Sequence, residues 1–276
     1  MPSAIAIAAH PDDIEFVMAG TLCLLQQAGW DIHYLNVSTG NLGSMKTKPA
    51  ETARIRRAEA RAAARRLGAT WHPPFCNDLE IFYDDRTLRR LAATIREVNP
   101  AVILTHSPQD YMEDHMTTAR LAITAAFARG IPGYRSAPAR AIAPGPVTIY
   151  HASPHGLRDW LRQAIVPGAF VDTTTVHRRK REALECHASQ GQFLDATQRM
   201  NSYLRTMDEF SLAMGRMSRR FTYAEGWRRH LHWGFCEEGD DPLRDALGRK
   251  YLINRQYEES LNAPSPAPPR RGRRAG

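Results

Sequence analysis

The sequence predicts an α/β fold of the Rossmann-like type, an open parallel sheet with helices on both faces. Two observations predict it. Short apolar runs alternate with helical segments over residues 1–130, and alternation on this scale forms right-handed β-α-β crossovers. In addition, the segments after the first and fourth predicted strands are rich in histidine and aspartate. Open parallel sheets bind their ligands beyond the carboxyl ends of strands.

Four strand–helix pairs make up the first half of the chain. The run at residues 3–9 is short and apolar, as in a buried parallel strand. The alanine- and arginine-rich segment 50–67 is strongly helical and ends at Gly68. Two prolines in segment 70–76 indicate an edge strand. Strands are expected at residues 3–9, 31–38, 70–76 and 101–105, and helices at 15–28, 50–67, 86–98 and 113–128.

The second half carries weaker patterns. Strands are expected at residues 147–151 and 169–171, and helices at 175–190 and 195–214. Because no linker precedes residue 260, we expect one α/β domain over residues 1–261. Residues 262–276 form a Pro- and Arg-rich tail that cannot bury a core, and we expect it to be disordered.

Composition and charge favour a cytoplasmic protein. The net charge is +8, but four tail arginines contribute to it, which leaves about +4 on the folded part. We therefore do not expect nucleic acid as the main partner. There is no signal-peptide pattern, no membrane span and no CxxC pair among the four scattered cysteines. The pattern leaves open whether the chain forms a homo-oligomer.

The tetrapeptide that begins at His10 follows the first predicted strand. It reads His-Pro-Asp-Asp and offers one imidazole and two carboxylates within four residues. These groups can act as metal ligands and as a base. A helix cap would explain one aspartate, but it leaves the histidine and the other aspartate unused.

A second cluster, residues 106–115, follows the fourth predicted strand and ends with Asp114-His115. If the fourth strand lies beside the first, in a 3-2-1-4-5 order, the two clusters face each other. Two imidazoles and one carboxylate then form a three-ligand set with an open position, as hydrolytic zinc requires. The alternative for His115 is a histidine at a helix start with no metal.

These motifs resemble the LmbE-like, or PIG-L, zinc-dependent N-deacetylases. The resemblance rests on HPDDxE at residues 10–15, D-x-x-x-D-H at residues 110–115, and Lys180 followed by His187-Ala-Ser-Gln190. It covers roughly residues 4–190. It implies an LmbE-like sheet and a Zn²⁺ ion bound by His10, Asp13 and His115.

The resemblance also implies roles for the neighbouring residues. Asp12 would be the general base that takes the proton of the attacking water. Asp114 would orient a histidine, although a helix cap explains it almost as well. Arg56 matches an arginine that reaches the substrate in relatives, with a solvated helix face as the alternative. Asp110 is placed with the substrate-binding residues.

One position departs from the family pattern. Many relatives have a histidine three residues before the ligand histidine, where it stabilises the oxyanion, and this chain has Met112. A thioether donates no hydrogen bond, and losing one such donor commonly costs two to three orders of magnitude in rate. Tyr111, His151 and His155 are candidate replacements, and the two histidines are placed in the substrate site.

The predicted function is zinc-dependent hydrolysis of an N-acyl group, most simply acetyl, from an amino sugar or its conjugate. Three alternatives remain: an amidase acting on a thiol or other conjugate, a non-catalytic metal- or sugar-binding protein, and a dinucleotide-binding enzyme. The carboxylates of the first β–α turn would repel a pyrophosphate, which disfavours the last. The Gly-rich segment 39–44 lacks a full phosphate-binding pattern.

Overall fold

The computed structural model describes residues 1–191 and 203–261. In these residues one eight-stranded sheet has the order β3-β2-β1-β4-β5-β7-β6-β8. Its strands are β1 (Ser3–Ala8), β2 (Asp31–Asn36), β3 (Thr70–His72), β4 (Val102–Thr105), β5 (Thr148–Ala152), β6 (Ala169–Asp172), β7 (Ala224–Arg229) and β8 (Tyr251–Ile253).

The first five strands form the parallel part of the sheet. β1 pairs with β2 on one side and β4 on the other, and β3 forms the edge. The expected 3-2-1-4-5 order is therefore confirmed, as is the placement of β3 at an edge. The order reverses between β2 and β4, on either side of β1, so the segments after β1 and β4 emerge side by side.

The other three strands correct the expectation of a purely parallel sheet. β7 pairs antiparallel with both β5 and β6, and β8 pairs antiparallel with β6. The sheet is therefore mixed. β7 has the sequence AEGWRR, whose charged residues hide it from a search for apolar runs. Glu225 and Trp227 in this strand are nevertheless buried.

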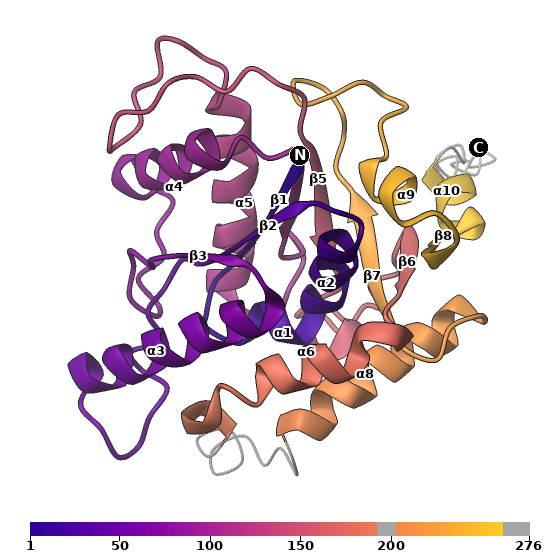
Figure 1. Cartoon of the computed structure of the whole chain (residues 1–276), viewed down its shortest axis with the longest axis horizontal. Helices are drawn as coiled ribbons and strands as arrows, with labels where there is room; N and C mark the ends of the chain where they lie inside the picture. Colours follow the sequence, from indigo (N-terminus) through magenta and orange to yellow (C-terminus); the bar gives the residue numbers. More distant parts are fainter. Residues whose placement is uncertain (192–202, 262–276) are drawn as a thin grey trace, which may run out of the picture.

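Helices cover both faces of the sheet, as predicted (Figure 1). Alternate residues of β1 separate two cores: Ala4, Ala6 and Ala8 face one, and Ile5 and Ile7 face the other. The helices in the described residues are α1 (Asp13–Val17), α2 (Ala19–Gln27), α3 (Pro49–Leu67), α4 (Asp85–Val98), α5 (Glu113–Ala128), α6 (His177–Leu184), α8 (Tyr203–Ser218), α9 (Pro242–Leu247) and α10 (Arg255–Leu261), with 3-10 turns η1 (His155–Leu157), η2 (Thr174–Val176) and η3 (Gly248–Lys250). The first core is closed by α2, α3, α6 and α9, and the second by α4 and α5.

Several helix boundaries differ from the expected ones. The helix expected at 15–28 is split at Met18, whose φ of −132° is not helical. The helix expected at 175–190 is shorter and spans His177–Leu184. The helix expected at 195–214 is present from Tyr203 and continues to Ser218, and residues 195–202 of that expectation lie outside the described residues. The predicted tail, residues 262–276, lies outside the described residues.

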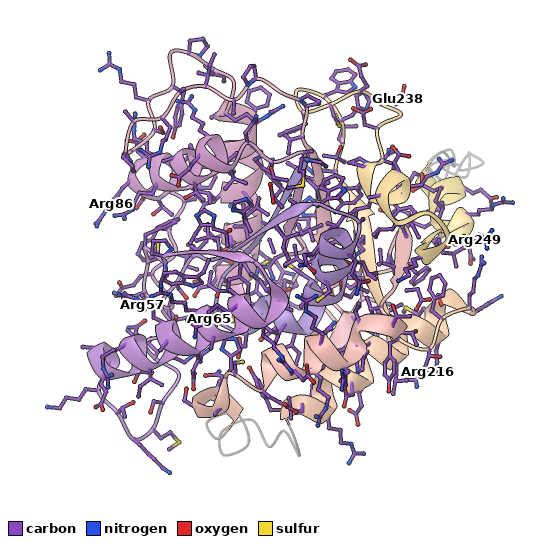
Figure 2. The ribbon with its side chains drawn as sticks, viewed as in Figure 1. Arg57, Arg65, Arg86, Arg216, Glu238 and Arg249 are labelled. Atoms are coloured by element: carbon purple, nitrogen blue, oxygen red, sulfur yellow. The ribbon has the colours of Figure 1, made fainter. Side chains whose placement is uncertain are left out.

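Arginines with exposed side chains are spread over several helices. Figure 2 labels Arg57 and Arg65 of α3, Arg86 of α4 and Arg216 of α8, and all four are exposed. This is the distribution that solvated helix faces produce. Arg56, the neighbour of Arg57, is by contrast only 2% exposed. Among the described helices, none combines the length and the apolar character that a membrane crossing requires.

Candidate metal centre and active site

Three side chains that the sequence suggested as metal ligands lie together beyond the carboxyl ends of β1 and β4. One ligand atom each from His10, Asp13 and His115 lies within 4.8 Å of the other two. Asp13 Oδ2 is 3.4 Å from His10 Nδ1, and Asp13 Oδ1 is 3.4 Å from His115 Nε2. The parallel pairing of β1 with β4 brings these residues together although about a hundred positions separate them.

The donor set fits zinc. Zinc–nitrogen and zinc–oxygen bonds of about 2.0–2.2 Å, meeting at a tetrahedral angle, hold the donor atoms roughly 3.3–3.5 Å apart. The two Asp13 distances of 3.4 Å, one from each carboxylate oxygen, are of this size. Two imidazoles and a carboxylate are also the donors of hydrolytic zinc sites.

The two histidines are each held from behind by a carboxylate. His10 Nε2 lies 2.9 Å from Asp114 Oδ2, and His115 Nδ1 lies 3.0 Å from Asp110 Oδ1. An Nδ1–H or Nε2–H that donates to a carboxylate leaves the other ring nitrogen free to bind a metal. Asp110, expected among the substrate-binding residues, instead lies 1% exposed against His115. Its position fits a residue that orients a ligand.

The charges of the cluster favour a cation at its centre. Burial opposes protonation of His10, yet hydrogen bonds to Asp114 and Asp13 raise its pKa to about 9. His115 is also buried, and Asp13 and Asp110 raise its pKa to about 10. Asp13 itself is buried, yet the adjacent His115 and His106 hold its pKa well below the usual range. These carboxylates stabilise positive charge, which a metal ion would supply.

His106 is a third imidazole in the cluster. Its Nε2 accepts a hydrogen bond from the Ala9 N–H at 2.9 Å, and its ring stacks on His115 with centroids 4.1 Å apart. Burial lowers the pKa of His106. The neutral ring therefore links the end of β1 to the ligand His115 by packing and by one backbone hydrogen bond.

Asp12 occupies a strained backbone position beside the candidate metal ligands. Its φ of 99° is in the left-handed region, which is uncommon for a residue other than glycine. Tyr203 donates to Asp12 Oδ2 at 2.5 Å, and Arg56 Nη2 lies 3.5 Å from the same oxygen. Burial raises the pKa of Asp12 to about 6, and the guanidinium of Arg56 opposes the shift. A carboxyl group with a pKa near neutrality suits a general base.

The candidate oxyanion donors separate into two groups. Tyr111 and His155 line the pocket, beside Met112, whereas His151 does not. His151 Nδ1 lies 2.8 Å from the His106 carbonyl oxygen, and its Nε2 lies 3.1 Å from His230 Nδ1.

His155 remains the candidate that reaches the pocket with an unused ring nitrogen. Its ring centroid is 5.5 Å from that of His115. Its Nε2 is buried and has no hydrogen-bond partner. Burial lowers the pKa of His155 to about 4, so at neutral pH the ring is neutral and carries one N–H.

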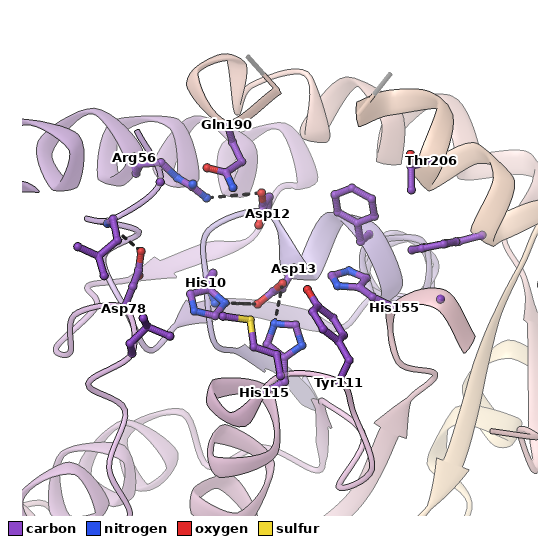
Figure 3. Close-up of a pocket in the computed structure, with 17 residues that line it drawn as sticks. His10, Asp12, Asp13, Arg56, Asp78, Tyr111, His115, His155, Gln190 and Thr206 are labelled. Carbon is purple, nitrogen blue, oxygen red and sulfur yellow. Dashed lines mark hydrogen bonds and ion pairs between the residues drawn. The ribbon is translucent and has the colours of Figure 1, made fainter. Parts of the chain in front are cut away.

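A pocket of about 520 Å³ opens over the cluster (Figure 3). Its polar side carries Arg56, Gln190 and Asp12, and Tyr111 and His155 lie on the other side of Asp13 in the figure. The pocket is lined by His10, Asp12, Asp13, Phe16, Leu42, Gly43, Arg56, Asp78, Leu79, Tyr111, Met112, His115, His155, Gly156, Gln190, Thr206 and Phe210.

The Gly-rich segment 39–44 shapes this pocket by letting Arg56 approach. A Cβ at Gly43 would lie 2.6 Å from both Arg56 Nη1 and Gln190 Oε1, and a Cβ at Gly40 would lie 2.9 Å from Arg56 Nε. Asp78 holds the loop by accepting hydrogen bonds from the N–H groups of Gly40 and Leu42. The glycines therefore make room for a buried guanidinium group.

Other residues of the family-like motifs lie in the core. Glu15 is buried and accepts a hydrogen bond from Tyr34 at 3.1 Å. Lys180 forms a buried ion pair of 2.7 Å with Glu225. Tyr203 was not identified from the sequence, because its signal is a single tyrosine far along the chain.

Comparisons with known proteins identify relatives of this chain. The PIG-L family model, described as GlcNAc-PI de-N-acetylase, matches residues 5–126. A 4-oxalmesaconate hydratase of Pseudomonas putida is 31% identical over 198 residues, which are 68% of this chain and 74% of the hydratase. A diacetylchitobiose deacetylase of Thermococcus kodakarensis is 28% identical over 236 residues, 81% of each chain. The crystal structure of the Pseudomonas putida 4-carboxy-2-hydroxymuconate hydratase superposes with a TM-score of 0.71 and 27% identity, covering 84% of this chain and 97% of that one.

The chain belongs to the PIG-L, or LmbE-like, family. Its fold is the LmbE-like mixed sheet with helices on both faces. The relatives named above include both a deacetylase and hydratases, so family membership by itself leaves the reaction open between these chemistries.

Proposed function

We propose that this protein is a zinc-dependent N-deacetylase that releases acetate from an acetylated amine, in the first place an amino sugar or its conjugate. The observation that carries the proposal is the placement of Asp12. Its carboxyl group lines the same pocket as His10, Asp13 and His115. Asp12 is adjacent to Asp13 in the chain, but it is outside the three-ligand set. The site therefore combines a metal-binding set with a separate base.

The residues divide the work of amide hydrolysis as follows. His10, Asp13 and His115 would hold the metal, and Asp110 and Asp114 orient the two imidazoles. Zinc, when bound, supplies Lewis-acid chemistry and makes water acidic enough to attack near neutral pH.

Asp12 would accept the proton of the attacking water and later donate it to the nitrogen of the leaving amine. Tyr203 and Arg56 hold the Asp12 carboxylate in place during both transfers. His155 would donate its N–H to the amide oxygen as that oxygen becomes negative, in place of the donor that Met112 lacks. The neutral state of His155 makes its N–H available without adding charge.

Hydration of a carbon–carbon double bond is the second candidate, because the relative from Pseudomonas putida that is 31% identical to this chain is a hydratase. The charge of the pocket disfavours it. 4-Oxalmesaconate, the compound in the name of that hydratase, is an unsaturated polycarboxylate. Among the described lining residues, Arg56 is the single lysine or arginine, while Asp12, Asp13 and Asp78 add negative charge. Several carboxylates would have too few cationic partners here.

One assay separates the two reactions. The purified protein is stripped with a chelator and assayed before and after zinc is restored. N-acetylglucosamine and N,N'-diacetylchitobiose are the amide probes, and acetate release is measured. In parallel, 4-oxalmesaconate is followed by the loss of its conjugated absorbance. We expect zinc-dependent acetate release and no hydration. Zinc-dependent hydration without acetate release would overturn the proposed deacetylation.

A further inference from the structure

One side of the pocket is an aromatic wall formed by Phe16, Tyr111, His155 and Phe210. The ring centroids of Phe16 and His155 are 5.0 Å apart, those of His155 and Phe210 5.8 Å, and those of Tyr111 and His155 6.2 Å. These side chains come from α1, the segment before α5, η1 and α8. Separate parts of the chain therefore build one continuous aromatic surface at the metal centre.

Apolar side chains continue this surface around the pocket. Leu42 and Leu79 belong to the lining and are 45% and 62% exposed. Met112, which follows Tyr111 in the sequence, also belongs to the lining. Exposed leucines at the rim of a pocket offer apolar contact to a bound ligand.

Part of the polar lining is already engaged. The Asp78 oxygens already accept hydrogen bonds from Ser38, Gly40 and Leu42. Arg56 Nε and Gln190 Oε1 are buried without a partner, and both side chains lie against Gly43. The unused polar atoms of these two side chains are therefore on one side of the pocket, across from the aromatic wall.

This arrangement suits an amino-sugar conjugate that carries an apolar group better than it suits a bare polyhydroxylated sugar. Each hydroxyl that leaves water without a new hydrogen bond is costly, and one sugar ring carries several of them. An aromatic or branched apolar group instead gains from contact with the wall, while Arg56 and Gln190 satisfy a single polar group.

We propose that the substrate is an amphipathic amide, in which an aromatic or branched apolar group near the acetylated nitrogen packs against the aromatic wall. This inference rests on the proposed deacetylation and specifies its substrate class. Phe16, which is buried, and Phe210, which is half-buried, provide the inner part of the wall, and Tyr111, which is 52% exposed, extends it to the rim.

The test compares two probes with the same reacting amide, the methyl and benzyl glycosides of N-acetylglucosamine. The zinc-loaded protein is expected to hydrolyse the benzyl glycoside with a kcat/KM about tenfold higher or more. Tyr111→Ser should reduce this preference severalfold, and Tyr111→Phe, which keeps the ring, should retain it. Phe82→Ser is the matched control, because Phe82 is 60% exposed but is outside the pocket lining.

The outcomes distinguish this inference from the proposed function. Equal kcat/KM for both probes overturns the inference and leaves deacetylation standing. If neither probe is hydrolysed, the proposed function fails for this class, and calorimetric binding of methyl and benzyl glucosaminide decides the inference. Benzyl binding at least tenfold tighter supports the aromatic wall as a binding surface, and equal affinities overturn it.

Discussion

Tyr203 donates a hydrogen bond to Asp12 Oδ2 at 2.5 Å, and the two residues are 191 positions apart. The bond ties α8 to the segment that follows β1. Both side chains are buried, and burial raises the pKa of the Tyr203 phenol well above its usual range. The phenol therefore stays protonated and acts as a donor to the carboxylate that we propose as the base.

The Tyr203→Phe variant should show that Tyr203 positions Asp12. Phenylalanine fills the same space but removes the donor, so Asp12 keeps Arg56 and loses one of its two restraints. We expect kcat to fall about tenfold, with KM and zinc content nearly unchanged. An unchanged kcat would mean that the hydrogen bond has no part in placing the base.

Replacing the carboxylates behind the ligands should weaken metal binding. In Asp110→Asn and Asp114→Asn the amide no longer matches the imidazole N–H of His115 or His10 as a carboxylate does. We expect zinc affinity to drop about 10–100-fold in each, measured by competition with a chromogenic chelator. Wild-type affinity in both variants would show that these aspartates do not orient ligands.

Gly43→Ala should disturb the polar side of the pocket without unfolding the protein. The added methyl would lie 2.6 Å from Arg56 Nη1 and Gln190 Oε1, the ends of flexible side chains, so these must move. We expect kcat/KM to fall about tenfold while Tm stays within a few degrees. Gly133→Ala is the matched control, because nothing lies within 4 Å of its new Cβ. Equal activity in the two variants would contradict the account of the glycine loop.

His155→Ala should lower the rate about a hundredfold or more while zinc stays bound, because the site loses its candidate oxyanion donor. His151→Gln, outside the pocket lining, should stay within a few-fold of wild type. A wild-type rate in His155→Ala would reject the compensation for Met112. Met112→His then becomes informative, since a large gain would mean that the natural site lacks a donor.

The part of the fold with regular alternation could be predicted from the sequence. Residues 113–128 are helical as expected, and β1 and β4 lie side by side as the strand-order argument required. The antiparallel strands could not be predicted, because β7 is charged and β8 is three residues long. Their placement depends on tertiary contacts such as the buried pair of Lys180 with Glu225.

The candidate site could likewise be predicted from the sequence only in part. Histidines and aspartates that follow strands are visible in sequence, and the structure brings His10, Asp13 and His115 together. The partner of each side chain was not predictable, since Asp110 and Asp114 are both near His115 in sequence but only Asp114 contacts His10. Tyr203 reaches Asp12 through helix packing, which no local pattern encodes.

The most direct test of the central claim is the Asp12→Asn variant, with zinc content and acetate release measured on the same preparation. The amide keeps the size of the side chain and leaves His10, Asp13 and His115 in place, but it cannot accept the proton of water. We predict wild-type zinc content and a loss of acetate release of about two to four orders of magnitude. A zinc-loaded Asp12→Asn protein that releases acetate at the wild-type rate would contradict the account.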